Sequence, residues 1–255
     1  MRYALISDIH ANLPALRAVL ADIDARKDVD AIYHLGDLTG YAPWPNEAVA
    51  LLRERGIPGI AGNYDSTVAA DYKHCGCRAD TPHDEELSHV SYEWTRANVT
   101  PETRKYLGSL PFRMDIRPLG GHVSGPTITL VHGNQSLNTV YVTDDRPDSF
   151  LEKMAGDIGA RAGDVVCFGH THKPWQRTVG GIQFINTGSV GRPKDGDWRA
   201  CYVLLTIDQS AATIDFVRVS YDVDEASDAI RRSDLPDEFA EVLKTGGAGV
   251  EAARQ

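Results

Sequence analysis

Five short polar segments constrain this 255-residue chain most, because each of them follows an apolar, strand-like run. The carboxyl ends of parallel strands lie at one edge of a sheet, where the ligands of open α/β sheets gather. The fold must therefore bring distant parts of the chain to one edge. The segments are Asp8-Ile-His10, Gly36-Asp37, Gly62-Asn63-Tyr64-Asp65, His132-Gly133 and Gly169-His170-Thr-His172.

These segments supply the side chains of a transition-metal site. Four imidazoles, two carboxylates and one amide suit Mn²⁺, Fe, Zn²⁺, Ni²⁺ or Co²⁺ better than Ca²⁺, which prefers oxygen ligands. Seven ligands are too many for one tetrahedral ion, so we expect two divalent ions that share a carboxylate, with Mn²⁺ as the first candidate. The expected ligands are Asp8, His10, Asp37, Asn63, His132, His170 and His172.

The order of residues inside two segments predicts paired ligands. In an extended chain, residues two apart point to the same side, so Asp8 pairs with His10 and His170 with His172. The glycines that precede the ligands of the second and third segments allow tight backbone paths.

Each segment alone has a plainer explanation. A D-x-H triplet or a Gly-Asp turn often occurs without a metal, and a single histidine such as His132 is commonly a hydrogen-bonded residue at a strand end. The occurrence of all five segments in this order, each after a strand, is what favours a metal site.

The charge of the chain limits its partners. Its formal net charge of −10 disfavours a broad nucleic-acid surface, so we expect a small anionic ligand that is attracted locally. Two divalent ions bring four positive charges and two carboxylates return two negative ones, which leaves the predicted site positive. The sequence does not decide whether the chain forms a homo-oligomer.

The apolar runs and the cysteines predict a cytoplasmic protein that does not enter a membrane. Asp8 interrupts the first apolar run, no secretory leader is visible, and no apolar run reaches the length of a membrane span. Four cysteines do not form the dense disulfide framework of a small secreted protein, so we expect a reducing compartment.

The distribution of apolar residues predicts one α/β domain over residues 1–255. Strands at 3–7, 31–35 and 57–61 alternate with helices that begin at Asn12-Leu-Pro14 and Asn46, which predicts parallel pairing. Later strands are expected at 127–131, 164–168, 182–185, 200–207 and 213–219, with a helix at 149–158. We expect two mixed sheets packed face to face with helices outside, a helical insertion or lid at about 66–110, and a helical C-terminal extension at about 222–255.

From Asp8 to about Asp197, these motifs resemble the calcineurin-like metallophosphoesterase superfamily, in particular its compact prokaryotic branch. In that family the D-x-H, G-D, G-N-H-D/E, V-H-G and G-H-T-H blocks hold two metals in a four-layer αββα sandwich. The resemblance implies that Asp37 bridges the ions. It implies Asp8, His10 and His172 at one ion, and Asn63, His132 and His170 at the other.

The same resemblance implies the activity. Members of the family hydrolyse phosphodiesters or phosphomonoesters with a hydroxide that bridges the metals. We therefore expect a small phosphate ester or a nucleotide as the substrate.

The sequence departs from the family at Tyr64, where the family most often has a histidine that protonates the leaving oxygen. Tyr64 and the adjacent Asp65 are the candidate catalytic residues. A tyrosine is a weaker acid than imidazolium, so a donor role predicts a preference for good leaving groups, such as aryl esters or nucleotides. In the alternative, Tyr64 only packs beside the site.

Other residues have two readings each. Arg192 is a candidate phosphate clamp or a solvated loop residue, and Asn12 is a candidate substrate-binding residue or, as we favour, a helix cap. Cys75 and Cys77 are more consistent with structural or redox-silent cysteines than with a zinc site, because no second Cys/His pair follows. Three aromatic residues could wall a pocket or belong to the core: Tyr41, Trp44 and Tyr141.

Two rival functions compete with this one. A metallo-β-lactamase-type hydrolase expects H-x-H-x-D-H, whereas Lys173-Pro174-Trp175 follows His172, which disfavours this class. A binding scaffold that lost turnover agrees with the missing motif histidine, although the complete ligand set argues against it.

Overall fold

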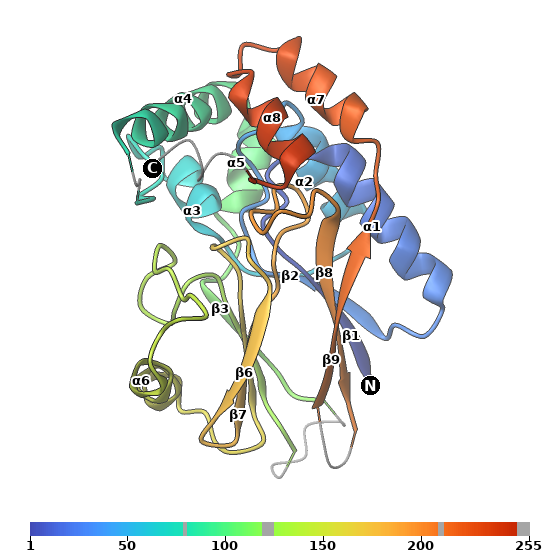
Figure 1. The fold of residues 1–255 in the computed structure, drawn as a ribbon, viewed down its shortest axis with the longest axis vertical. Helices are drawn as coiled ribbons and strands as arrows, with labels where there is room; N and C mark the ends of the chain where they lie inside the picture. The colour runs from blue at the N-terminus through green and yellow to red at the C-terminus, as the bar shows by residue number, and fades with distance from the viewer. Residues whose placement is uncertain (79–80, 119–124, 209–211, 249–255) are drawn as a thin grey trace.

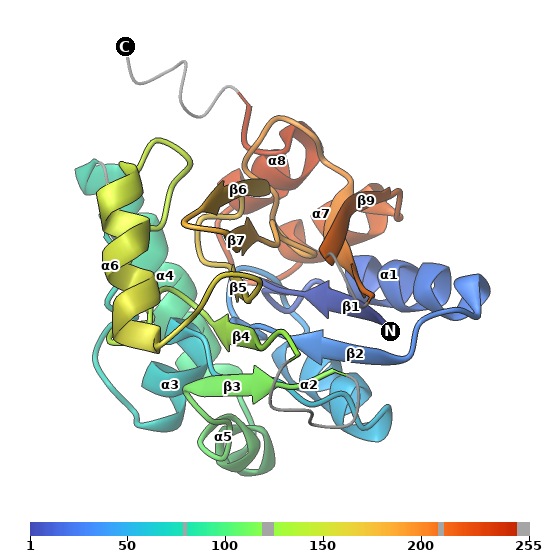
Figure 2. The same ribbon diagram turned by 90° about the horizontal axis from the view of Figure 1, so that it is seen from below.

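Two mixed β-sheets pack face to face in this protein, with helices on both outer sides (Figures 1 and 2). The computed structural model describes residues 1–78, 81–118, 125–208 and 212–248. Within these residues, one sheet has the strand order β2-β1-β8-β9 and the other has the order β3-β4-β5-β7-β6. The expected α/β sandwich of two mixed sheets is confirmed.

The first sheet is built around β1 (Arg2–Ile6). This strand pairs in parallel with β2 (Ala31–His34) and antiparallel with β8 (Ala200–Ile207), which in turn pairs with β9 (Ala212–Val219). A helix separates β1 from β2 along the chain, so the parallel pairing expected from the strand–helix–strand pattern is confirmed.

The second sheet has a parallel centre and antiparallel edges. The strands β4 (Ile128–Val131), β5 (Val165–Phe168) and β7 (Ile182–Asn186) run in parallel. The edge strands β3 (Arg113–Ile116) and β6 (Trp175–Val179) are antiparallel to their neighbours. Every residue of β4 and β5 is buried, as expected for parallel strands that are covered on both faces.

The alternation of side chains along the strands explains the layers. In β1, Tyr3 and Leu5 point into the core between the sheets, whereas Ala4 and Ile6 point towards the helices. In β5, Val165 faces the same core between the sheets. Because both faces of these strands are apolar, each sheet needs a cover on its outer side as well as a partner sheet.

The helices provide these covers. α6 (Asp148–Ile158) lies on the outer side of the second sheet, and α1 (Leu13–Arg26) lies on the opposite side of the molecule (Figure 2). α7 (Val223–Arg231) and α8 (Glu238–Thr245) form a pair that packs into the same core as α1. The remaining helices are α2 (Pro45–Glu54), α3 (Asn63–Ala69), α4 (Pro82–Asn98) and α5 (Pro101–Leu107).

Three sequence-based expectations about the elements were wrong. Residues 57–61 do not form a strand but make one bridge, between His34 and Gly59, because Pro58 has no N–H for a ladder. The edge strands β3 and β6 were not expected, since their exposed positions break the apolar pattern. α3 begins at Asn63, within the segment for which only a tight backbone path was expected.

The expected insertion and extension coincide with helices. α3, α4 and α5 cover most of 66–110, and α7 and α8 lie within 222–255, of which residues 249–255 are outside the described part. A lid role for the insertion stays a prediction. Among the helices that the structure describes, none combines the length and the apolar character that crossing a bilayer requires.

The buried side chain of His34 predicts that the folded protein loses stability in acid. Neither ring nitrogen has a hydrogen-bond partner among the described residues, and burial lowers the pKa of His34 to about 3. The unfolded chain binds a proton near pH 6.5, whereas the folded one does not, so this residue costs stability as the pH falls below about 6.5.

We therefore expect His34→Leu to reduce the acid sensitivity of folding. Between pH 7 and pH 5, the wild type should lose about 2 kcal/mol more free energy of unfolding than the variant. Urea unfolding at the two pH values measures this difference, and the histidines of the metal centre cancel because both proteins contain them. Parallel losses in the two proteins would show that His34 is not the cause.

Candidate metal centre

The seven expected ligands converge at the strand ends of both sheets. Asp8 and His10 follow β1, Asp37 follows β2, and His132 follows β4. His170 and His172 follow β5, and Asn63 is the first residue of α3; the side chains of all seven are buried. The structure forms two triads within which the candidate ligand atoms lie within 4.8 Å of one another. They are Asp8 with His10 and His172, and Asp37 with His132 and His170.

The backbone reason given for the paired ligands was wrong. Asp8, His10, His170 and His172 are not extended; all four have positive φ angles between 47° and 67°. These left-handed turns place His170 and His172 in different triads rather than on one side. Asp and His tolerate this conformation better than most residues, which fits their use at such turns.

Two glycines let the loops after β2 and before α3 touch. A side chain on Gly36 would collide with the backbone of Gly62, and a side chain on Gly62 would collide with Asp37. Asp65 fixes this contact, since its carboxylate accepts hydrogen bonds from the backbone N–H groups of Leu38 (3.0 Å) and Gly62 (2.9 Å). Asp65 therefore positions the loops that carry Asp37 and Asn63. This geometry supports a positioning role for Asp65 rather than the expected catalytic one.

Backbone carbonyls determine which ring nitrogen of each histidine is free. His10 Nδ1 lies 3.0 Å from Thr39 O, and His132 Nδ1 lies 2.7 Å from Leu35 O. His172 Nδ1 lies 2.7 Å from Arg192 O. A carbonyl only accepts, so Nδ1 carries a proton in all three rings, which leaves Nε2 as the nitrogen that can bind a metal ion.

These Nε2 atoms face other acceptors. His10 Nε2 lies 3.0 Å from His172 Nε2, and His172 Nε2 lies 3.2 Å from Asp8 Oδ1. His170 Nε2 is buried and has no hydrogen-bond partner among the described residues. Such an arrangement is unfavourable without a shared proton or cation, so the donor set fits metal ions.

Asp37 lies between the triads. Its Oδ1 accepts a hydrogen bond from Tyr64 N–H (2.9 Å), which directs Oδ2 towards His132 Nε2 (3.4 Å) and His10 Nε2 (3.8 Å). The expected bridging role of Asp37 agrees with this position.

The amide of Asn63 also fits a cation. Its Oδ1 faces acceptors only, at 3.0 Å from His170 Nδ1 and 3.2 Å from both His132 Nε2 and Asp37 Oδ2. Its Nδ2 donates to Cys75 O (3.3 Å) and to Cys77 Sγ (3.1 Å). An oxygen among three acceptors is satisfied when a metal ion binds between them.

The protonation of the histidines supports this argument. Burial, and then the charge of His172, lower the pKa of His10 to about 3. Burial opposes protonation of His132, but the carboxylates of Asp37 and Asp8 raise its pKa to about 10. Without a metal, a proton thus takes the cationic place beside Asp37, and binding of a divalent ion would displace it.

A pocket of about 610 Å³ opens over the triads, a size typical of small-molecule sites. Tyr41 and Tyr141 line it, with ring centroids 5.0 Å from His10 and 4.3 Å from His170, respectively. Trp44 is half-buried and packs against the main core. The basic residues that line the pocket are Arg78, Arg146, Lys173, Arg192 and Lys194; of these, sequence reasoning singled out only Arg192.

Two substrate-binding candidates have different surroundings. The guanidinium of Arg192 lies 4.2 Å from the ring centroid of Tyr41, and its buried Nε has no hydrogen-bond partner among the described residues. Its role as a phosphate clamp stays a prediction. Asn12 instead caps α1, accepting from Ala15 N–H (3.2 Å), while its Nδ2 donates to Gly191 O (2.9 Å). This buried position supports the cap rather than substrate binding.

Tyr64 is buried, and its hydroxyl donates to Ser91 Oγ (3.2 Å) on α4. Burial raises the pKa of Tyr64 well above 10, with a smaller contribution from Tyr41. The geometry therefore favours the alternative in which Tyr64 packs beside the site.

The two cysteines of the Cys75-Gly-Cys77 segment form a disulfide. Neither sulfur is then a thiolate, which rules out the zinc reading in this state. The remaining cysteines, Cys167 and Cys201, are free and buried.

Sequence reasoning missed the groups that orient the ligands. The carbonyls of Leu35, Thr39 and Arg192 carry no side-chain signal, so no sequence pattern could identify them. Ser7 donates to Asp8 Oδ2 (2.6 Å), and its place next to a ligand was the available signal.

Comparisons with known proteins extend over most of the chain. Residues 1–210 match the model of the calcineurin-like phosphoesterase superfamily domain. The uncharacterized protein MJ0912 of Methanocaldococcus jannaschii is 30% identical over 258 residues, covering 95% of this chain and 97% of that protein.

Two solved structures are similar along nearly their whole length. A metallophosphoesterase from Sphaerobacter thermophilus is 29% identical, with a TM-score of 0.72 and coverage of 96% of this chain and 99% of that one. The hypothetical protein PH1004 from Pyrococcus horikoshii has a TM-score of 0.80 at 23% identity, with coverage of 96% and 98%, and shares the fold.

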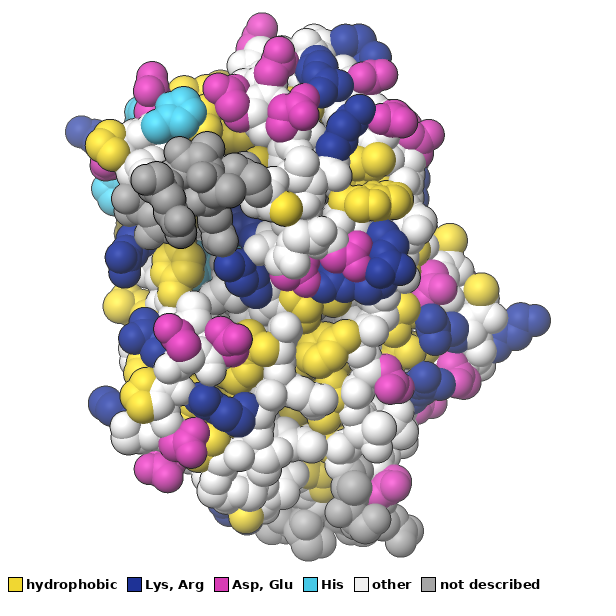
Figure 3. Space-filling view, viewed as in Figure 1, with side chains coloured by type: hydrophobic (Ala, Val, Ile, Leu, Met, Phe, Trp, Pro, Cys, Tyr) yellow, Lys and Arg dark blue, Asp and Glu magenta, His cyan; other side chains and the backbone are white. Residues whose placement is uncertain are grey.

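The absence of a broad nucleic-acid surface, expected from the net charge, stays a prediction. On the face shown in Figure 3, the dark blue Lys and Arg side chains are interspersed with magenta Asp and Glu side chains. This mixture agrees with the expectation of a local rather than a broad anion site.

The facing lone pairs predict that metal ions stabilise the fold. At a Mn²⁺ concentration about 100 times Kd, the wild type should gain about 2.7 kcal/mol for each ion bound, or about 5–10 °C in Tm per ion. Asp37→Asn should gain much less, because it removes the shared carboxylate, whereas the exposed Glu152→Gln should behave as the wild type. Thermal melts with and without Mn²⁺ measure this, and equal shifts in all three proteins would contradict the site.

Proposed function

The chain belongs to the calcineurin-like phosphoesterase superfamily, and from this we propose that it is a dinuclear metal-dependent phosphoesterase acting on phosphodiesters, phosphomonoesters or both. The observation that carries the proposal is the pair of buried triads beneath the pocket, in which the Nε2 atoms of His10 and His172 face each other and the carboxylate of Asp8. Two divalent ions held there, with Mn²⁺ as the first candidate, would lower the pKa of a bound water and polarise phosphoryl oxygens.

The ligand assignment follows the triads. We assign Asp8, His10 and His172 to one ion and Asn63, His132 and His170 to the other, with Asp37 shared. Backbone carbonyls hold the rings of His10, His132 and His172 in the orientation that turns Nε2 to the metal, and Asp65 holds the loop that carries Asp37. The protein thus prepares the site before the substrate arrives.

The pocket lining supports a small anionic substrate. Five basic side chains line the pocket against three acidic ones, Asp37, Asp84 and Asp145, although the whole chain has a net charge of −10. The volume of about 610 Å³ exceeds what a phosphate group needs and leaves space for an organic group such as a nucleoside or an aryl ring. Tyr41 and Tyr141 offer flat surfaces for it.

The described part of the pocket offers no histidine that could donate a proton to the leaving group. Every histidine among the described pocket residues belongs to a triad, so none of them is spare to act as the general acid. Substrates whose leaving oxygen needs no protonation, such as aryl esters and nucleoside phosphate anhydrides, are therefore favoured. The second candidate function, a binding scaffold without turnover, rests on this same observation.

Hydrolysis of bis-p-nitrophenyl phosphate separates the two functions. Protein loaded with Mn²⁺ should release nitrophenol, and Asp37→Asn should lose at least about a hundredfold in kcat/KM, as for the loss of a group that holds the catalytic ions. A panel of p-nitrophenyl phosphate, linear and cyclic nucleotides and dinucleoside polyphosphates, repeated with Ni²⁺ and Zn²⁺, then defines the preference. Release by the wild type no faster than by Asp37→Asn would favour the scaffold.

The hydrogen bond of Tyr64 predicts a small effect of its removal. Tyr64→Phe leaves Ser91 Oγ bonded to Tyr41 N–H (3.0 Å), so we expect kcat to change by less than about fivefold for aryl and alkyl esters alike. Tyr92→Phe, another buried tyrosine, is the matched control. A loss confined to alkyl esters would instead identify Tyr64 as the proton donor.

A further inference from the structure

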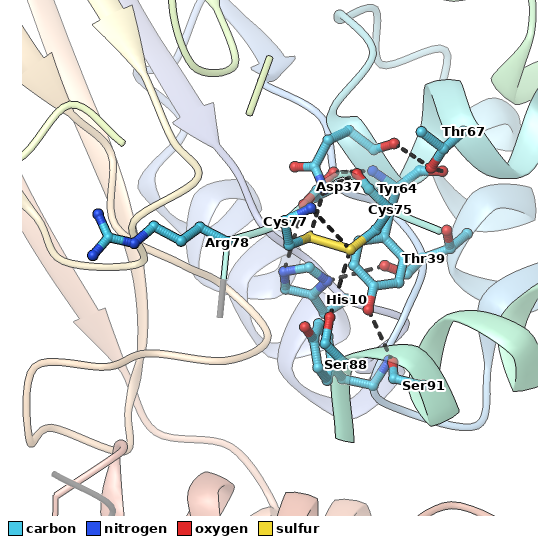
Figure 4. Close-up of a disulfide and its surroundings, with 12 residues drawn as sticks. His10, Asp37, Thr39, Tyr64, Thr67, Cys75, Cys77, Arg78, Ser88 and Ser91 are labelled. Atoms are coloured by element: carbon cyan, nitrogen blue, oxygen red, sulfur yellow. Dashed lines mark hydrogen bonds and ion pairs between the residues drawn. A yellow bond between two sulfur atoms is a disulfide. The ribbon is translucent and has the colours of Figure 1, made fainter. Parts of the chain in front are cut away.

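The disulfide between Cys75 and Cys77 lies at the border between the pocket and the core (Figure 4). Cys75 is 5% exposed and belongs to the main apolar core, whereas Cys77 is partly exposed and lines the pocket. The bond closes a ring with one residue between the cysteines, so it restrains little of the unfolded chain. Its effect on the folded protein is therefore local.

The local effect falls on Asn63. Both hydrogen bonds that the amide Nδ2 donates go to this segment, to Cys75 O and to Cys77 Sγ. They hold Oδ1 in the direction of His170 and His132, where we assign it to a metal ion. A partner that orients a metal ligand in this way contributes to metal affinity.

We propose that Cys75 and Cys77 form a redox-active site whose disulfide holds Asn63 in the metal-binding orientation and whose reduction weakens metal binding. This proposal rests on the metal centre proposed above, but not on its turnover. It assigns a role to a sequence segment that the phosphoesterase chemistry does not use.

The surroundings of the two sulfurs define the reduction step. A thiolate of a dithiol reductant attacks Cys77 Sγ, which the pocket exposes, and the electron pair of the S–S bond leaves on Cys75 Sγ. Ser88 Oγ–H (3.5 Å) and Cys77 N–H (3.3 Å) point to Cys75 Sγ and stabilise the departing thiolate.

The second thiol of the reductant then displaces Cys77 from the mixed disulfide. The protein gains two electrons and two protons, and the reductant becomes a disulfide. With the ring open, Cys77 Sγ can rotate away from Asn63 Nδ2, because no bond to Cys75 holds it there. The amide then loses one of its two anchors.

The pocket rim lies next to this ring. Arg78 follows Cys77 directly, Ser88 lies on α4, and both line the pocket (Figure 4). Through Asn63, the loop before α4 that contains the disulfide contacts the site to which we assign the metal ions. The state of the disulfide is expected to affect ion affinity first, because the contacts to Asn63 are direct.

The test measures metal affinity in the two redox states. Wild-type protein is treated with dithiothreitol and desalted anaerobically; the oxidised sample is desalted in parallel, and both are titrated with Mn²⁺ against a fluorescent chelator. Reduction should lower the affinity of the protein for one of the two ions by about 10- to 100-fold. Alkylation under denaturing conditions should label two cysteines in the oxidised sample and four in the reduced one.

Two variants control this experiment. Cys75→Ser with Cys77→Ser should show the weaker affinity with or without reductant, whereas Cys201→Ala keeps the pair and should still respond. Equal affinity in the two states of the wild type, or four labelled cysteines in protein prepared without reductant, would overturn the proposal.

Turnover distinguishes this proposal from the proposed function. Redox-dependent affinity in a protein that hydrolyses no ester supports the cysteine site and contradicts only the phosphoesterase function. Hydrolysis with identical affinity in both states contradicts only the cysteine site.

Discussion

Buried imidazoles that turn their unprotonated nitrogens towards one another are the constraint on which this structure depends. The carbonyls of Thr39 and Arg192 hold the protons of His10 and His172 on Nδ1, which leaves two unprotonated Nε2 atoms 3.0 Å apart. Cations bound between these nitrogens would satisfy both of them. The nearby carboxylates of Asp8 and Asp37 have the same requirement, because buried anions need a partner.

The sandwich supplies the rigidity that this constraint demands. Ligands come from the ends of β1 and β2 in one sheet and of β4 and β5 in the other, so the relative position of the sheets determines the distances between ligands. The core between the sheets fixes that position through close packing of side chains such as Leu5, Leu130 and Val203. The packing that stabilises the core therefore also determines the geometry of the metal centre.

The sequence was sufficient for the layers and for the convergence of the ligands, because both follow from local pattern. The apolar runs of β1 and β8 and the positions of the polar segments after such runs are visible in the residues themselves. The backbone turns at Asp8 and His170, the edge strand β6 and the hydroxyl partner of Tyr64 were not predictable. Each of them depends on a contact between segments that are distant in sequence or on a conformation that another segment enforces.

The left-handed turns at the ligands show why the site is formed by the whole fold rather than by its segments. Five ligand residues have positive φ, namely Asp8, His10, Asp37, His170 and His172, and each such turn costs about 1–2 kcal/mol. Their sum approaches the net stability of a typical domain, about 5–15 kcal/mol, so no isolated segment would keep these turns. Hydrogen bonds from His170 N–H to Asp8 and from His10 N–H to Asp37 O hold them across the interface of the two sheets and between loops. Bound cations would add to this support, because they interact favourably only with the strained arrangement in which all the ligands face the same point.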